Sequence, residues 1–155
     1  MNLPAQRLLP GGVRLFACVL ASLISVGMAQ ADEPRRLSFD DVKFDIERNA
    51  DYDAALLTDE IRGLDGQRVR ISGYIRPSVK QSGIQRFIFV RDNQECCFGP
   101  GAMIYDCMIV TLASGNETEF TTRAITVEGT FYIKEFIGPD DRIWAVFRMK
   151  DAEVR

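Results

Sequence analysis

Two segments of this chain alternate between apolar and polar residues and are each interrupted by a glycine. In residues 68–75 and 125–133 every second residue is apolar or glycine, which is the period of a strand with one buried face. Gly73 and Gly129 fall on the apolar side of these segments. Glycine inside a strand typically marks a bulge or a sharp bend. Because bent strands curl a sheet, the two segments favour a small closed or partly open barrel.

Three further segments have the composition of strands, at residues 87–90, 104–112 and 143–149. Helical spacing is confined to residues 57–64, where Thr58 is placed to cap the first turn. The 155 residues leave room for one such domain. The pattern therefore predicts an all-β fold, a small five-stranded barrel of the oligonucleotide/oligosaccharide-binding (OB) type with one short N-terminal helix. The OB-like domain would span residues 57–155, preceded by an N-terminal arm at residues 32–56.

Residues 1–31 have the pattern of a secretory signal peptide. Arg7 and Arg14 precede an apolar run at residues 15–28, and a small-x-small cleavage site ends at Ala31. The run is shorter than the ~20 apolar residues of a spanning helix. We expect a periplasmic or secreted protein that does not span the membrane once the leader is cleaved.

Charge and histidine content exclude several classes of function. Residues 32–155 hold 17 basic and 22 acidic side chains, and a surface of that sign argues against nucleic acid as a partner. The chain has no histidine, so it cannot by itself build a Ser-His-Asp or Cys-His catalytic site. No carboxylate pair is placed well enough to suggest catalysis, and we expect a protein that is not an enzyme.

The stretch from Glu95 to Cys107 contains every cysteine that remains after the leader, namely Cys96, Cys97 and Cys107. In an oxidising compartment the pattern favours a disulfide from Cys97, or alternatively Cys96, to Cys107. Closing so short a loop contributes about 2 to 3 kcal/mol in the chain-entropy model. A bond between the adjacent Cys96 and Cys97 would be strained.

A thiolate metal site is the alternative interpretation of this stretch. Its ligands would be Cys96, Cys97 and Cys107 with the carboxylates of Glu95 and Asp106, a set that suits copper or zinc. No cofactor is expected otherwise. Thiol-redox activity is a third hypothesis, which acidic neighbours of the cysteines disfavour because they raise a thiol pKa.

Three aromatic residues are candidates for a ligand face. Tyr74 and Tyr132 fall on the polar side of their alternating segments, and Trp144 lies in the last predicted strand. Aromatic side chains in such positions suit contact with a protein or glycan.

A set of motifs runs across most of the chain after the leader, at residues 57–66, 73–77, 90–92, 95–102, 105–107 and 127–131. These motifs resemble a family of exported bacterial proteins, the domain of unknown function 3299 (DUF3299). The resemblance implies an envelope location, a small β-barrel and an envelope partner such as an inner-membrane transporter, and it brings no established activity. Together with the residues it predicts a binding or accessory module of unknown ligand, with metal binding for envelope metal transport as the alternative.

Overall fold

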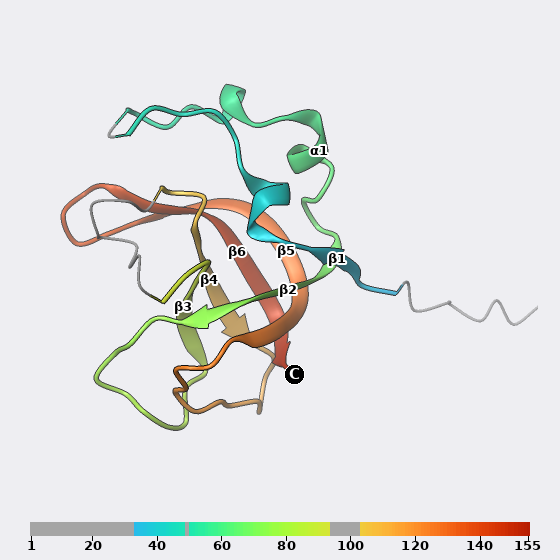
Figure 1. Cartoon of the computed structure of the whole chain (residues 1–155), viewed down its shortest axis with the longest axis vertical. Coiled ribbons are helices and arrows are strands. Elements are labelled where there is room, and N and C mark those ends of the chain that lie inside the picture. The colour runs from blue at the N-terminus through green and yellow to red at the C-terminus, as the bar shows by residue number, and fades with distance from the viewer. Residues whose placement is uncertain (1–32, 49, 94–102) are drawn as a thin grey trace, which may run out of the picture. The chain divides into compact units, whose positions relative to one another are not determined.

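The computed structural model describes residues 33–48, 50–93 and 103–155, and strands dominate this part of the chain (Figure 1). This confirms the all-β class. In chain order the elements are β1 (Arg35–Leu37), the 3-10 helices η1 (Phe39–Val42) and η2 (Ala54–Leu56), α1 (Asp59–Arg62), β2 (Arg68–Ile75), β3 (Arg86–Val90), β4 (Cys107–Leu112), β5 (Ile125–Ile137) and β6 (Ile143–Val154).

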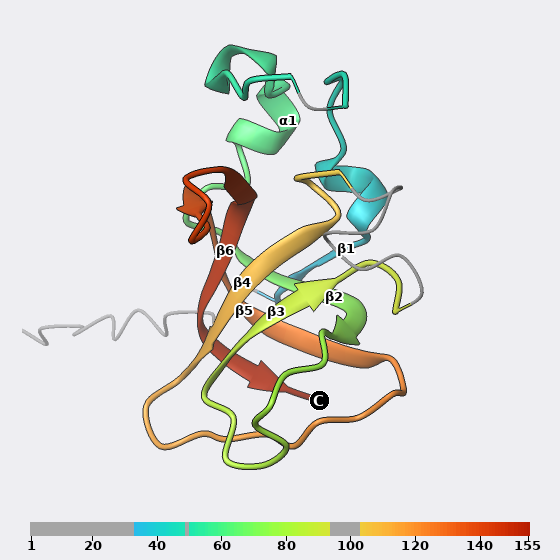
Figure 2. The same ribbon diagram turned by 90° about the vertical axis from the view of Figure 1, so that its left-hand side faces the viewer.

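The strands β2 to β6 pair in a closed circuit. β2 pairs with β3, β3 with β4, β4 with β6, β6 with β5, and β5 again with β2. Only the β4–β6 pair within this circuit is parallel. The sixth strand, β1, is three residues long and adds to β2 in parallel. Figures 1 and 2 show the curl of the sheet that lets β5 pair with β2 as well as with β6.

The two glycines singled out in the sequence lie where strands approach most closely. A Cβ atom on Gly73 would be 2.6 Å from the backbone oxygen of Val90, and across Gly73 the partner of β2 changes from β1 to β3. A Cβ on Gly129 would be 2.9 Å from the backbone oxygen of Lys150. The register of β5 against β6 shifts between Glu128 and Thr130, so the irregularity expected at Gly129 is present.

The core is shared between the strands and the segment that joins β1 to β2. Phe39 and Phe44 are buried in the same cluster as Phe131 and Phe147, so the segment before α1 contributes directly to the core. Burying one such side chain contributes about 1.5 to 3 kcal/mol.

The helix α1 is shorter than the helical spacing predicted. Thr58 caps it as expected, with its Oγ1 accepting from the Ile61 amide at 3.3 Å. The chain leaves the helix at Gly63 and reverses at Gly66, which has a φ of 78°. Leu57 and Leu64 nevertheless lie in the core on either side of it. Within the described residues, none of the helices has the length and apolar character needed to cross a lipid bilayer.

Candidate functional site

A second apolar cluster lies on the outer side of the strands, apart from the core. Its buried members are Val90, Cys107, Ile109 and Ala145, and the half-buried side chains of Tyr74, Ile88 and Phe136 pack against them. The alternation of β3 and β4 explains its position, since Phe87, Phe89, Met108 and Val110 point into the core and the residues between them point outward. We call this group the outer cluster. β3 and β4, which provide most of it, run side by side in Figure 2.

A pocket with a volume of about 370 Å³ adjoins the outer cluster. Ile88, Ile109 and Phe136 of the outer cluster form its apolar wall, together with Phe87 and Pro77. Arg76, Ser78 and Arg86 supply its polar groups, and no acidic residue is among the described residues that line it. Pockets of a few hundred Å³ with apolar walls and a few polar groups are typical of ligand sites.

Cys107 lies at the start of β4, within the outer cluster, and its side chain is 2% exposed. Its Sγ donates a hydrogen bond to the backbone oxygen of Trp144 at 2.9 Å. Cys96 and Cys97 lie outside the described residues, so the disulfide to Cys107 stays a prediction. Thiol-redox activity depends on the same two cysteines and stays a hypothesis.

Asp106, the other described member of the expected metal ligand set, is engaged by groups of the protein. One carboxylate oxygen accepts from the Met103 amide at 2.9 Å, and the other lies 3.4 Å from the Nε of Arg91. Arg91 also pairs with the carboxylate of Asp40. No group of three or more potential metal ligands occurs in the described ranges, and Glu95, Cys96 and Cys97 lie outside them. The copper or zinc site therefore stays a prediction.

The aromatic candidates for a ligand face occupy different surroundings. Tyr74 packs against the outer cluster, and Trp144 meets Phe136 edge to face with their ring centroids 6.2 Å apart. The indole of Trp144 donates to Asp140 at 2.8 Å, which fixes its orientation in the β5–β6 hairpin. Tyr132 is not part of the outer cluster; its ring centroid is 5.4 Å from the ammonium nitrogen of Lys150. Of the three candidates, Tyr74 thus belongs to the outer cluster, and Trp144 contacts the cluster through Phe136.

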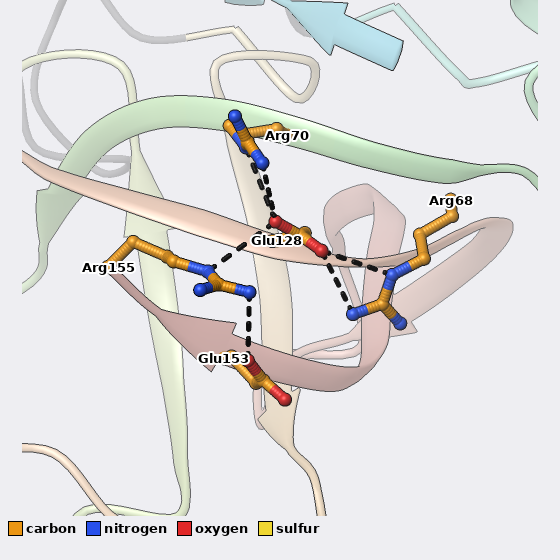
Figure 3. A network of polar contacts seen from close by, with 5 residues as sticks. All are labelled: Arg68, Arg70, Glu128, Glu153 and Arg155. Carbon is orange, nitrogen blue, oxygen red and sulfur yellow. Dashed lines mark hydrogen bonds and ion pairs between the residues drawn. The ribbon is translucent and has the colours of Figure 1, made fainter. Parts of the chain in front are cut away.

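A separate charged network spans the seam between β2 and β5 (Figure 3). The Glu128 side chain, 6% exposed, accepts from Arg68 at 3.1 Å and from Arg70 at 2.9 Å, one guanidinium on each carboxylate oxygen. Arg155 approaches to 3.5 Å and links Glu128 to Glu153. The hydrogen bond from Arg70, aided by Arg68 and Arg155, holds the pKa of Glu128 below its usual range despite burial of the carboxyl.

Sequence reasoning missed the pocket and this network for the same reason. Phe136 and Arg86 are 50 residues apart and meet only because β3, β4, β6 and β5 are consecutive neighbours in the sheet. Arg70 and Glu128 are direct partners in the β2–β5 register. The available signal was weak: outward-pointing residues of opposite charge on two alternating segments.

The fold and this face together define a small all-β domain with an apolar outer side and an adjoining cationic pocket. Comparison with solved structures finds the crystal structure of a DUF3299 family protein from Pseudomonas aeruginosa PAO1, with a TM-score of 0.51, 19% sequence identity, and coverage of 78% of this chain and 94% of that chain. No family model and no curated protein matches the sequence. The chain therefore resembles this DUF3299 protein in fold, as its motifs predicted.

Proposed function

We propose that this chain is an exported binding module of the cell envelope, which holds a partner protein on the outer cluster and its pocket. One observation supports this function above others. Apolar side chains gather on the outer side of β3 and β4, apart from the core and beside a pocket. The outer side of a strand in a small domain is normally polar, whereas here the half-buried side chains of Tyr74, Ile88 and Phe136 present apolar surface beside a pocket, which is typical of a contact surface.

The fold supports the same assignment by analogy. OB-type barrels commonly bind their ligands on the face of the second and third strands of the barrel. In the closed circuit these strands are β3 and β4, which provide Ile88, Val90, Cys107 and Ile109 of the outer cluster. The analogy concerns the location of the site and says nothing of the ligand, because one fold serves many functions.

The proposed location and partner rest on the sequence. The signal-peptide pattern of residues 1–31 supports export. An accessory role beside an inner-membrane transporter follows from the resemblance to DUF3299. In the exported protein we propose a disulfide between Cys107, which lies in the outer cluster, and Cys97 or Cys96.

Site-specific photocrosslinking in living bacteria tests the contact face. A photoreactive benzoylphenylalanine replaces the exposed Ser78 at the pocket rim in one variant and the exposed Arg36 on β1 in the control. Arg36 pairs with Arg70 of β2, and Arg70 lies six residues before the pocket residue Arg76. At the rise of an extended chain, the control therefore lies roughly 20 Å from the pocket. We expect one discrete adduct of an envelope protein from position 78 alone. Equal labelling from both positions, or no adduct from position 78, would contradict the proposal.

Cell fractionation with a thiol count tests the location and the disulfide. We expect the protein outside the cytoplasm, beginning at Asp32, with one titratable thiol before reduction and three after it. Three thiols before reduction, without metal, would refute the disulfide. Three reduced thiols with stoichiometric copper or zinc would favour the metal-binding alternative.

A further inference from the structure

The chemistry of the pocket indicates what it binds. We propose that it takes a carboxylate attached to an aromatic or branched apolar group, with Arg86 receiving the carboxylate and the wall of Ile88, Ile109 and Phe136 receiving the apolar part. This inference rests on the proposed function, because it names the ligand class of the same face.

The charge of the pocket selects for an anion. Two arginines line it, and no carboxylate is among its described lining residues. Arg86 makes no ion pair with any other residue in the described ranges. An incoming anion therefore need not displace a carboxylate from Arg86, and the low-dielectric wall beside it strengthens the attraction.

The position of Arg86 relative to Phe136 suits a planar carboxylate. The guanidinium carbon lies 5.5 Å from the centroid of the Phe136 ring, within the range of a cation–π contact. A guanidinium that rests on an aromatic face keeps its in-plane N–H groups for a partner, and their fork matches the two oxygens of a carboxylate.

A second arginine, Arg148, also contacts the ring of Phe136. The guanidinium carbon of Arg148 is 5.9 Å from the same ring centroid, and Arg148 is anchored by donation to the backbone oxygens of Lys134 and Glu135. Two guanidiniums near one ring offset the negative potential of its π face, which would otherwise repel an anion. The wall is thus both apolar and compatible with a nearby negative charge.

The apolar wall excludes a ligand that is only an anion. Acetate would leave most of the 370 Å³ unfilled by apolar contact, whereas a phenyl ring would cover the aliphatic and aromatic side chains. The same chemistry can come from a free aromatic acid or from a chain terminus with an apolar last residue. The test separates the two sources.

Amide NMR on the labelled full-length protein provides the test. The probes are 3-phenylpropionate, 3-phenylpropylamine with the opposite charge, acetate without the ring, and two pentapeptides ending in phenylalanine, one with a free carboxylate and one amidated. We expect saturable shifts at Arg86, Ile88 and Phe136 from 3-phenylpropionate, with a Kd on the order of 1 mM, and none from the amine or acetate at the same concentration. If the free-carboxylate peptide binds at least tenfold more tightly than 3-phenylpropionate, the source of the carboxylate is a chain terminus. If 3-phenylpropionate binds and the peptide does not bind more tightly, the source is a free acid.

Matched variants assign the effect to the pocket. Arg86→Gln should weaken binding of 3-phenylpropionate at least fivefold, and Arg86→Lys should weaken it by a smaller factor. Arg36→Gln should leave the affinity for 3-phenylpropionate unchanged. The spectra of the unliganded variants show whether each remains folded. Binding of the amine equal to that of the acid, absence of binding by every carboxylate probe, or equal affinity of the Arg86→Gln and Arg36→Gln proteins would overturn the inference.

The two proposals fail in different ways. If position 78 gives a crosslinked adduct but the protein binds no carboxylate probe, the contact face is supported and the proposed ligand class is contradicted. If the protein binds 3-phenylpropionate but position 78 gives no adduct, the ligand class of the pocket is supported and the protein partner is contradicted.

Discussion

Replacing Glu128 by glutamine should destabilise this protein, because its buried carboxylate joins several arginines. The carboxylate receives two N–H groups from Arg68, at 3.2 and 3.1 Å, and two from Arg70, at 3.3 and 2.9 Å. Glutamine keeps the size of the side chain but removes the charge. It also turns an amide N–H₂ donor toward one of the guanidiniums, which are donors themselves.

The magnitude follows from the exposure of the groups involved. Hydrogen bonds to charged groups contribute about 1.5 to 3 kcal/mol when buried, whereas exposed ion pairs contribute about 0 to 1 kcal/mol. Glu128 is 6% exposed, but Arg68 and Arg70 are 41% and 30% exposed, so the network lies between these limits. We expect Glu128→Gln to lower the free energy of unfolding by about 2 kcal/mol at pH 7. In urea that lowers the midpoint by about 1 M.

The pH dependence has a definite sign. The folded-state pKa of Glu128 is lowered relative to that of an unfolded glutamate, chiefly by the hydrogen bond from Arg70. Its contribution is therefore complete above the unfolded pKa of about 4.3 and is lost as the pH falls through the folded value. The difference between the wild type and Glu128→Gln should be constant from pH 5 to pH 8 and should shrink below about pH 4.

Urea denaturation followed by circular dichroism at several pH values measures both effects. Glu153→Gln is the matched control, because Glu153 is 44% exposed. Within the described residues its one ion pair is with Arg155, at 3.3 Å. We expect the control to change stability by less than about 0.5 kcal/mol. The reasoning is refuted when Glu128→Gln and Glu153→Gln behave alike at pH 7, or when the loss in Glu128→Gln persists unchanged at pH 3.

Three further predictions concern the backbone and the hairpin. Gly73→Ala should lower the free energy of unfolding, measured in urea, by at least about 2 kcal/mol, because its Cβ would be 2.6 Å from a backbone oxygen. The control Gly63→Ala should be neutral or slightly stabilising, because the nearest atom to its Cβ would be 3.4 Å away and its φ is helical. Gly138→Ala places a Cβ 2.2 Å from the indole of Trp144, so the emission of this single tryptophan should shift to longer wavelength; an unchanged spectrum would contradict the packing. Thr58→Ala should lower the free energy of unfolding by about 1 kcal/mol through loss of the helix cap, and a change below 0.3 kcal/mol would show that the cap is dispensable.

The all-β class could be predicted because each strand has its own local signal. The alternation of residues 68–75 matches the buried and exposed sides of β2 residue by residue, and the glycines at 73 and 129 lie at close approaches of the backbone. Strand ends were less accurate. The predicted strand at 104–112 begins only at Cys107, since the chain turns with the Asp106 amide donating to Met103. β5 and β6 run beyond residues 133 and 149, because their ladder continues past bulges that break the alternation.

The site could be predicted only where it depends on neighbours in the sequence. The cysteine-rich stretch was recognisable as a group, and Cys107 lies on the outer cluster. The pocket was not recognisable, because its residues come from the segment that follows β2 and from β3, β4 and β5, and their meeting depends on strand order. Phe136 carries no local signal of a strand, since it follows a bulge in β5 and precedes Gly138 and Pro139, which are typical of a turn.

The distribution of charge shows why composition was a poor guide to the ligand of this face. Residues 33–66 hold ten acidic and five basic side chains, whereas residues 67–155 hold eleven acidic and twelve basic ones. The excess of negative charge thus belongs to the segment before β2, while Arg76 and Arg86 line the pocket. Exposed charges more than about 8 Å apart are largely screened at physiological salt. The sign of a bound group is consequently set by the arginines that touch it, and an acidic protein can present a site for a carboxylate.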